Sequence, residues 1–537
     1  MAPVGVATYV APGRNGKGGT LRKGWLVVCC VAFSLALSGS AGATVSFGIT
    51  EDTTAPIDAT TFYADLNDLG ATENRIQVLW DPARPTAIAD QAGLDVWVPQ
   101  AAIRGVRVIF AVAPAHPRDL TASPAAIGQF SAFLQLLATT YPSVKDFIIG
   151  NESNLSRFWQ PQFNPNGTGA SGFAYESLLA ASYDALKAKD TSINVIGIGL
   201  SPRGNDNPRA KSNVSTSPVR FLHDIGVAYR ASKRTKPLMN ELAFHPYPNQ
   251  NNDPPLKGYP WPNAGIPNLD RIKQAVWDAF NGTAQPTFGE RGKPRPANAL
   301  RLDLDETGWQ VAIPSALQAL YVGKESVTPV DERTQAQYYG DIIRTVTCDP
   351  DIRLLSFFHL IDERDLDRWQ SGLLRIDGTR RPSYDAVKSA IAQTHGQCAL
   401  TPLGWAHATS VIGGAVRFGY LSARSTRNKI WRFRALAQEE ATYRAAIFRV
   451  GKGKLTPTAR RAVLRALASG RSRPLLAARG IVKAYSSKLV KLQKKGLKRG
   501  GWYVYGIRLG AAMNPQQRSL TAVSKPFRVV APPRPRR

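Results

Sequence analysis

The chain has 537 residues, of which 43% are hydrophobic, so it can bury a substantial core and exceeds one ordinary domain in length. Its formal net charge is +29, but residues 401–537 hold 30 of the 68 Lys and Arg residues and only 2 of the 39 acidic ones. The first 400 residues are therefore nearly neutral. This distribution argues against a chain that binds nucleic acid along its whole length.

The amino terminus has the pattern of an export signal. A basic Arg-Lys pair precedes an apolar run at residues 25–37, and small residues with an A-x-A pattern follow at 41–43. We predict cleavage before Thr44, so that residues 1–43 form a signal peptide. The run is short for a membrane span, and an uncleaved anchor is the alternative. We expect a secreted protein, extracellular or cell-wall associated, with no membrane span after cleavage.

Eight short apolar segments recur after this signal and are expected to be strands. They are residues 45–49, 75–80, 106–112, 144–149, 193–198, 242–244, 300–304 and 354–358. Segments with helical periodicity lie between them, among them 127–139, 174–189, 334–345 and 383–394. Such alternation predicts the α/β class, and eight repeats favour a closed (β/α)8 TIM barrel over an open sheet.

The pattern changes near residue 399. Short aromatic and β-branched segments at 442–450, 480–486 and 502–509 predict a small all-β domain, an Ig-like antiparallel sandwich. We interpret the basic residues 488–499 as a linker. The predicted domains are the signal 1–43, the barrel 44–398, the basic sandwich 399–530 and a disordered tail 531–537.

Two of the four cysteines remain after signal cleavage, Cys348 and Cys398. In an exported protein they most simply form one disulfide, and two free buried thiols are the alternative. Cys348 precedes the eighth strand and Cys398 follows the last helix, so a bridge would lie at the bottom of the barrel. It would stabilise the closure by roughly 3 to 4 kcal/mol.

Polar residues interrupt the apolar pattern where the fourth and seventh strands end. Asn151 and Glu152 follow the fourth strand, and Glu306 follows the seventh. These strands face each other across the barrel mouth, so the two glutamates can converge and act as acid and nucleophile on a glycosidic bond. A helix cap or a solvated loop acid is the alternative for the pair at 151–152. We expect Asp303 and Asp305 to pair with neighbouring basic residues, and Asp305 to turn to the other face of its strand.

Five segments, in order, resemble one known family. They are NRIQVLW at 74–80, GNESN at 150–154, FHPYP at 244–248, DETGW at 305–309 and the stretch 371–391. They resemble the retaining glycoside hydrolases of the clan A barrels, the cellulase-like and xylosidase-like enzymes. The resemblance implies Glu152 as acid/base, Glu306 as nucleophile, Asn151 as a donor to the sugar 2-hydroxyl, Tyr247 as a donor to the nucleophile, and Arg75 and His245 in the site.

The chain departs from that family at the end of the eighth strand, where many members place a tryptophan. It has SFFHLIDE there, so we expect Phe358, His359 or Trp369 to substitute. Trp80 and Trp309 are further candidates to stack on sugars, and ordinary packing is equally open for both. A structural ion pair is the alternative for Arg75, and a satisfied core histidine for His245.

The expected ligand is a polysaccharide or oligosaccharide, and the expected protein is a monomer that needs no cofactor. The six histidines show no metal-ligand spacing, so we predict no catalytic metal. The basic carboxyl-terminal domain fits an anionic cell-wall polymer, whereas nucleic acid fits its charge but not the export signal. A solvated surface is the plain alternative. A non-catalytic carbohydrate-binding barrel is the rival to the hydrolase, and a transglycosylase would use the same residues.

Overall fold

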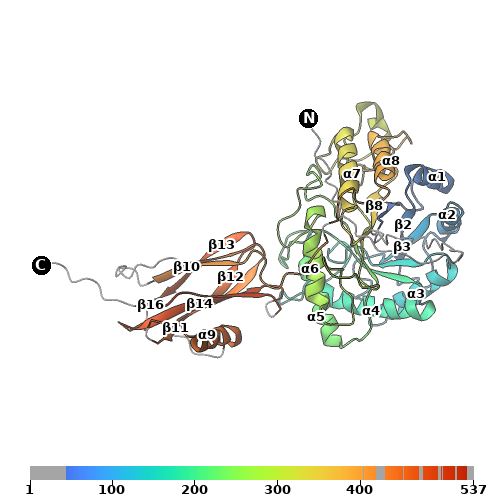
Figure 1. Cartoon of the computed structure of the whole chain (residues 1–537). Helices are drawn as coiled ribbons and strands as arrows, with labels where there is room; N and C mark the ends of the chain where they lie inside the picture. The colour runs from blue at the N-terminus through green and yellow to red at the C-terminus, as the bar shows by residue number, and fades with distance from the viewer. Residues whose placement is uncertain are drawn as a thin grey trace, which may run out of the picture. The chain divides into compact units, whose positions relative to one another are not determined.

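The computed structural model describes residues 44–528, apart from 403, 419–429, 452, 471–475, 494–496, 499 and 515–516 (Figure 1). The predicted signal peptide and the predicted tail lie outside the described residues.

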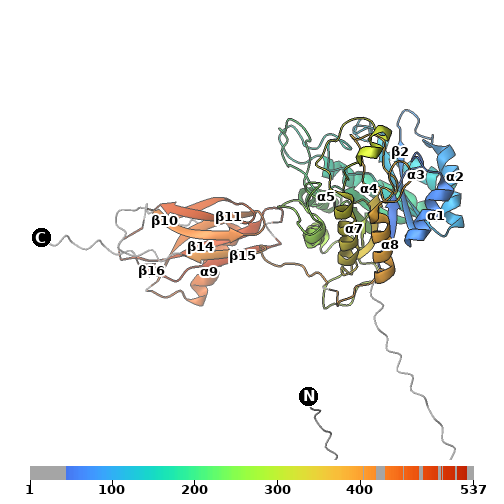
Figure 2. The ribbon, with the colours of Figure 1, turned by 90° about the horizontal axis from the view of Figure 1, so that it is seen from above.

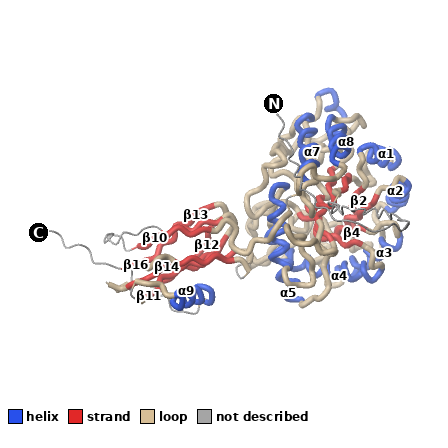
Figure 3. The backbone as a smooth tube through the Cα atoms, viewed as in Figure 1, coloured by secondary structure: helices blue, strands red, loops and turns tan. Residues whose placement is uncertain are grey.

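Eight parallel strands form a closed barrel in chain order, as predicted (Figure 3). They are β1 (Ser46–Thr50), β2 (Glu73–Trp80), β3 (Arg107–Pro114), β4 (Asp146–Ile149), β5 (Asn194–Leu200), β6 (Glu241–Phe244), β7 (Leu302–Leu304) and β8 (Ile352–Phe358). The ring closes where β1 pairs with β8, with Ser46 opposite Leu354. The protein therefore has the TIM-barrel fold, whose carboxyl-terminal strand ends carry chemistry.

Helices surround the strands, as Figures 1 and 2 show. They are α1 (Ala59–Leu69), α2 (Gln91–Ile103), α3 (Ala126–Thr140), α4 (Ser171–Lys189), α5 (Pro218–Ser232), α6 (Leu269–Phe280), α7 (Glu332–Val346) and α8 (Pro382–Thr394). Several begin at side-chain caps: the carboxylate of Asp331 accepts the N–H of Thr334 at the start of α7. No helix in the described part of the chain is long and apolar enough to cross a membrane.

The inside of the barrel is filled by small and branched side chains from β3, β4, β5, β6 and β8. They are Ile109, Ala111, Ile148, Ile196, Ala243 and Leu354, and all are fully buried. Because β4 is covered on both faces, all four of its residues are buried, and the same holds for the three residues of β7.

A buried arginine lies among carboxylates near the amino-terminal strand ends. The guanidinium of Arg353 on β8 bonds Asp303 on β7 and Glu73 on β2, and lies 2.9 Å from a carboxylate oxygen of Glu241 on β6. Asp303 thus pairs with a basic neighbour, as expected. One guanidinium thus serves three carboxylates at the bottom of the barrel, and burial raises the pKa of Asp303 well above its ordinary value.

The carboxyl-terminal part is an all-β domain of two sheets, as predicted. One sheet has the order β13-β10-β9, and the other β12-β11-β14-β15 with β16 beside β14. The strands are β9 (Ala415–Phe418), β10 (Ile430–Ala437), β11 (Ala441–Val450), β12 (Leu476–Val482), β13 (Ser486–Gln493), β14 (Trp502–Ala511), β15 (Ser519–Val523) and β16 (Phe527–Arg528). Side chains of both sheets share one apolar core, so the sheets pack face to face.

Two features of this domain differ from the sequence prediction. The supposed basic linker at 488–499 begins within β13, because Val490 and Leu492 alternate with exposed lysines and enter the core. A helix, α9 (Pro457–Ser469), covers the larger sheet with Val463 and Leu467. The side chain of Thr456 caps its amino terminus.

The predicted disulfide is present between Cys348 and Cys398. It joins the turn after α7 to the segment after α8, and the carbonyl of Gly396 in that segment accepts the N–H of Val45 just before β1. The bridge therefore staples the closure of the barrel at its amino-terminal side.

Candidate active site

The loop after β4 presents the first carboxylate of the site. Gly150 has φ +84° and Glu152 has φ +41°, so the chain turns sharply through left-handed conformations. Such a conformation is uncommon for glutamate and is found at functional sites. The Glu152 N–H donates to the carbonyl of Gly199 at the end of β5, at 2.7 Å, which holds the turn in place.

One histidine contacts both predicted catalytic carboxylates. Nδ1 of His245, just after β6, lies 3.2 Å from Oε1 of Glu152 and 3.4 Å from Oε2 of Glu306. The separation of these two oxygens therefore cannot exceed the sum of these two distances. The structure brings together the ends of β4, β6 and β7 as the sequence indicated.

Arg75 on β2 is the second cation of the site and is 2% exposed. Its Nη2 lies 2.9 Å from Oε1 of Glu306 and donates to Oδ1 of Asn151 at 2.8 Å. Burial opposes the guanidinium charge, but Glu306 and the neighbouring Asp305 raise the pKa of Arg75 above its ordinary value. Arg75 therefore stays charged and orients the Asn151 amide, so that its NH₂ group points away from Arg75.

Tyr247 completes the surroundings of Glu306. Its hydroxyl donates to Oε2 of Glu306 at 3.1 Å. Burial, followed by the charge of Glu306, raises the pKa of Tyr247 well above its ordinary value, so the hydroxyl keeps its proton. Glu306 is thus contacted by a guanidinium, an imidazole and a phenol, whereas among the described residues Glu152 hydrogen-bonds through its carboxylate to His245 alone.

The expectation that Asp305 faces away from the site is wrong. Asp305 is fully buried, and its Oδ2 lies 3.3 Å from Nε2 of His245 and 3.4 Å from Nε of Arg75. Strand alternation fails here because β7 ends at Leu304, so neighbouring residues beyond it need not point to opposite faces.

The charges of the site shift one another's protonation. Burial disfavours a charged imidazole, but Glu306 and Asp305 outweigh it and raise the pKa of His245 to about 10. At neutral pH His245 is therefore an imidazolium that donates through both ring nitrogens. Burial raises the pKa of Glu306, and the positive charges of His245 and Arg75 oppose that rise.

Three predicted substrate contacts are buried. Trp80 is fully buried and packs edge-on against Phe130 of α3. Trp309 is 1% exposed, and its ring N–H donates to the carbonyl of Asp253. Nδ1 of His359 lies 3.0 Å from both the Thr50 carbonyl and a Glu51 carboxylate oxygen at the end of β1. Buried indoles offer no face to a sugar, so the surroundings of Trp80 and Trp309 lend their predicted role no support.

Trp369, from the loop after β8, lies beside the site. Its ring centroid is 4.7 Å from that of Tyr247 and 5.5 Å from that of Phe358. It is partly exposed, unlike Trp80 and Trp309. Phe358 is also partly exposed, with its ring centroid 6.3 Å from that of Tyr247, so Trp369 is the nearer of the two partly exposed rings to this partner of Glu306.

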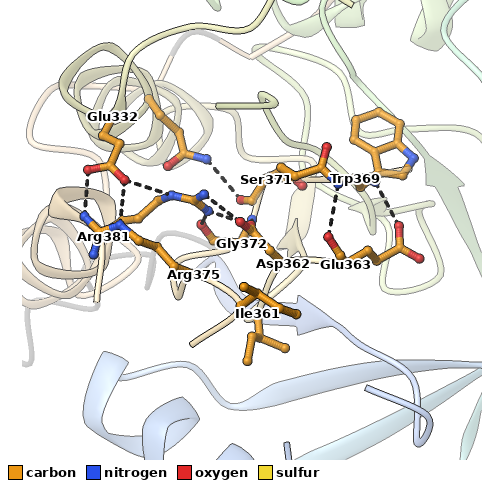
Figure 4. Close-up of polar contacts among 12 residues, drawn as sticks. Glu332, Ile361, Asp362, Glu363, Trp369, Ser371, Gly372, Arg375 and Arg381 are labelled. Atoms are coloured by element: carbon orange, nitrogen blue, oxygen red, sulfur yellow. Dashed lines mark hydrogen bonds and ion pairs between the residues drawn. The ribbon is translucent and has the colours of Figure 1, made fainter. Parts of the chain in front are cut away.

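Buried ion pairs hold the loop that carries Trp369 (Figure 4). Arg381 makes two bonds of 2.6 Å to Asp362, and both side chains are fully buried. Glu332 of α7 pairs with Arg375 and Arg381 on the same side. At the other end of the network in Figure 4, the backbone N–H of Trp369 donates to the carboxylate of Glu363. The loop is thus fixed on both sides of the indole.

Asn154 is a structural residue of the site that sequence reasoning missed. Its fully buried amide donates to the carbonyls of Ser201 and Thr216 and accepts the N–H of Ser201, which ties the loop after β4 to the loop after β5. The GNESN motif contains it, but an asparagine in a loop gives no sign of which backbone it will bond. Among the described residues, no cluster of His, Cys, Asp and Glu has an arrangement that could hold a metal ion.

Comparisons with known proteins give only distant likenesses. No protein-family model matches, and no curated protein matches by sequence. Among solved structures, a family 39 glycoside hydrolase from Bacteroides cellulosilyticus WH2 is 13% identical, with a TM-score of 0.46 over 84% of this chain and 81% of that one. A monomeric β-xylosidase from Caulobacter crescentus CB15 is 14% identical, with a TM-score of 0.41 over 84% and 94%. GH5_18 from Streptomyces cattleya, solved with GlcNAc, is 17% identical, with a TM-score of 0.43 over 69% and 84%. At these values the likeness assigns neither an activity nor a substrate to this chain.

Proposed function

We propose that this protein is a retaining glycoside hydrolase that cleaves O-glycosidic bonds, β-linked, of a polysaccharide or oligosaccharide. The observation that carries the proposal is the pair of carboxylates from β4 and β7 that meet at one nitrogen of His245. Their separation is limited to the sum of 3.2 and 3.4 Å. This limit favours the spacing of about 5 to 5.5 Å typical of retaining enzymes over the roughly 6.5 to 9.5 Å of inverting ones.

The surroundings of the two carboxylates support different roles. Arg75, Tyr247 and His245 all direct hydrogens at Glu306, which holds its carboxylate in place and suits it as the nucleophile. Of these three donors, only His245 contacts the carboxylate of Glu152 among the described residues. With fewer such contacts, Glu152 is suited to the role of general acid and base.

The reaction then takes two steps. Glu306 attacks the anomeric carbon while Glu152 gives its proton to the leaving oxygen, and the sugar becomes an ester of Glu306. Glu152, now ionised, takes a proton from water, whose oxygen displaces Glu306 and regenerates both groups. The Asn151 amide, oriented by Arg75, is placed to donate to a sugar hydroxyl during both steps.

A panel of fluorogenic aryl β-glycosides tests the activity. We expect at least one to be cleaved, with β-configured product appearing first by NMR, and Glu306→Gln to lower kcat by about 10³-fold or more. Circular dichroism and the melting temperature control for folding. If no glycoside is cleaved while sugars still bind, the protein is a binding barrel. An α-configured first product would exclude the retaining mechanism.

We further propose that the protein is exported and acts as a monomer. The charge pattern and small residues before Thr44 support export. The amino-terminal sequence of protein recovered from the medium tests this, and the expected first residue is Thr44. Analytical ultracentrifugation tests the monomer. An intact amino terminus on membrane-bound protein would favour the uncleaved anchor.

For the carboxyl-terminal domain we propose binding to an anionic cell-wall polymer. Across the β10 and β9 pairing, exposed Arg434 lies directly opposite exposed Arg417. Like charges at such positions destabilise a sheet unless an anion lies between them. Retention of the protein on isolated cell wall should fall steeply as salt rises from about 0.05 to 0.5 M, because the salt screens exposed charges. Retention that does not depend on salt would contradict this proposal.

A further inference from the structure

A third carboxylate, that of Asp305, contacts the same two cations, Arg75 and His245, that contact the proposed catalytic carboxylates. Arg75 and His245 contact Glu306, and His245 also contacts Glu152. Asp305 lies against the other atoms of the same two cations, Nε of Arg75 and Nε2 of His245. Asp305 is fully buried, so a sugar bound in the site would not touch it.

The imidazole of His245 has a carboxylate at each of its nitrogens. Nε2 lies 3.3 Å from Asp305, while Nδ1 faces Glu152 and Glu306. A carboxylate bonded to one ring nitrogen fixes the orientation and protonation of the ring at the other. Asp305 is therefore placed to decide which hydrogen His245 presents to the catalytic pair.

The charge balance of the cluster depends on Asp305. With Arg75 and His245 charged, two ionised carboxylates neutralise the cations, and the third carboxyl can hold a proton. Burial alone would raise the pKa of Asp305, but His245 and then Arg75 lower it below the ordinary value. Burial raises the pKa of Glu306, so Asp305 is the carboxylate that these two cations hold most firmly in its ionised form.

We propose that Asp305 is a positioning residue: it anchors His245 as a doubly donating imidazolium whose other nitrogen faces Glu152 and Glu306. The inference rests on the proposed glycoside hydrolase activity. The groups that face His245 are Glu152 from the end of β4, Asp305 and Glu306 from the end of β7, and Tyr247 beside it. Arg75 from β2 contacts Asp305 and Glu306.

Asp305→Asn tests the proposal, because it removes the charge and keeps the shape. Asp303→Asn, two residues earlier on β7, is the matched control: it also removes a fully buried ion-paired aspartate, but Asp303 is bonded to Arg353 at the other end of the barrel. Histidine ¹⁵N NMR follows the titration of His245, whose signals are assigned as those absent from His245→Gln.

We expect His245 to titrate at least about one pH unit lower in Asp305→Asn and at its original pH in Asp303→Asn. We expect kcat to fall about 10- to 100-fold with KM within about threefold, and the basic limb of the pH–rate profile to move to lower pH. Asp305→Glu, which restores the charge, should recover part of kcat.

Several results would overturn the proposal. These are an unshifted His245 titration in Asp305→Asn, an equal shift in Asp303→Asn, or unchanged kcat and pH profile. If Asp305→Asn does not fold, the wild-type titration decides alone, because His245 titrating near its ordinary pKa of about 6.5 would mean that Asp305 does not hold its proton. If the wild-type protein cleaves no glycoside, the hydrolase proposal fails while the titration still tests Asp305.

Discussion

Each end of the barrel buries one arginine among carboxylates. The two arginines differ in how tightly they bind these carboxylates, and we infer that one stabilises the fold and the other serves the active site. At the amino-terminal end, Arg353 makes several bonds of 2.5 to 2.9 Å to Glu73 and Asp303 and is buried, although its side chain is slightly more exposed than that of Arg75. At the carboxyl-terminal end, Arg75 and His245 lie 2.9 to 3.4 Å from the carboxylate oxygens of Glu152, Asp305 and Glu306, which is a looser arrangement. Strand β7 contributes to both, since Asp303 faces the lower cluster and Asp305 the upper.

The upper cluster is less completely satisfied. Nε of Arg75 lies 3.4 Å from the nearest Asp305 oxygen, and, among the described residues, Oδ1 of Asp305 has no hydrogen-bond partner. Glu152 and Glu306 each keep a small exposed fraction, 14% and 10% of their side chains. Buried polar atoms without a hydrogen-bond partner are uncommon, and perturbed buried groups are typical of active sites. We therefore infer that the lower cluster around Arg353 stabilises the fold. The upper cluster around Arg75 and His245 is suited to a reaction in which carboxyl groups gain and lose protons.

Replacing the two arginines with methionine should give opposite outcomes. We expect Arg353→Met to lower the free energy of unfolding by about 3 to 5 kcal/mol, because it leaves buried carboxylates without their cation. We expect Arg75→Met to cost less than half as much, because Glu306 can take up a proton, yet to lower kcat by about 10²- to 10³-fold. Urea titrations and kinetics on the same preparations measure both quantities.

The comparison of the two ends fails if the variants behave alike. Equal losses of stability with equal residual activity would mean that both clusters are structural. Arg75→Lys is the control for charge alone: it keeps the cation but cannot contact Glu306 and Asn151 with one rigid fork, so we expect only partial activity.

The disulfide belongs to the stabilising end. Cys348→Ser, with Cys398→Ser, should lower the free energy of unfolding by roughly 3 to 4 kcal/mol, because the bridge closes a long loop in the unfolded chain. We expect kcat at a temperature well below the melting point to stay within about twofold. A large loss of kcat in the folded variant would show that the amino-terminal closure also shapes the active site.

The sequence predicts the barrel well because its elements are set by local patterns. All eight strands and the four named helices appear close to their expected positions, since buried parallel strands read as short apolar runs. The same local signals support α9, where Thr456 and Pro457 mark a helix start and Val463 and Leu467 share a face. That helix was missed because its many arginines resemble the basic segments around it.

Strand order predicts which site residues follow the strand ends, but it does not predict where their side chains point. The positions of Glu152 and Glu306 follow from strand order in a barrel, whereas the family resemblance implied those of His245, Tyr247 and Arg75. The role of Asp305 follows from neither, because the side-chain direction beyond the short β7 depends on contacts with β2 and β6. The burial of Trp80 and Trp309 also depends on distant helices, so periodicity could not separate packing from an open sugar platform.

The two clusters should also differ in their response to pH, because an arginine does not titrate in the accessible range but a histidine does. The folded pKa of His245 is raised to about 10, above the ordinary value of about 6.5. Its protonation therefore stabilises the fold fully below about pH 6.5, and this contribution is lost as pH rises through about 10.

The difference in melting temperature between wild type and His245→Gln measures this contribution. We expect it to be several degrees at about pH 6 and to shrink steadily towards about pH 10. His359, whose pKa is raised to about 9, titrates in both proteins and cancels in the difference. A difference that stays constant with pH would mean that His245 is neutral in the folded protein.

The smallest expected effect concerns Trp369, at the rim of the upper cluster. Trp369→Ala should raise KM about 3- to 10-fold, because a sugar that stacks on the indole loses roughly 0.5 to 1.5 kcal/mol of binding. We expect little change in kcat with a small aryl glycoside, since Tyr247 keeps its own bond to Glu306. The ion pairs of Arg381 with Asp362 and Glu332 hold the loop without help from the indole, so the melting temperature should hardly move (Figure 4). Trp369→Phe is the matched control and should restore most of the affinity by presenting a smaller flat face. If kcat falls and KM does not change, the indole acts by holding Tyr247 against Glu306, and Trp369 is then part of the packing of the nucleophile rather than a surface for the sugar.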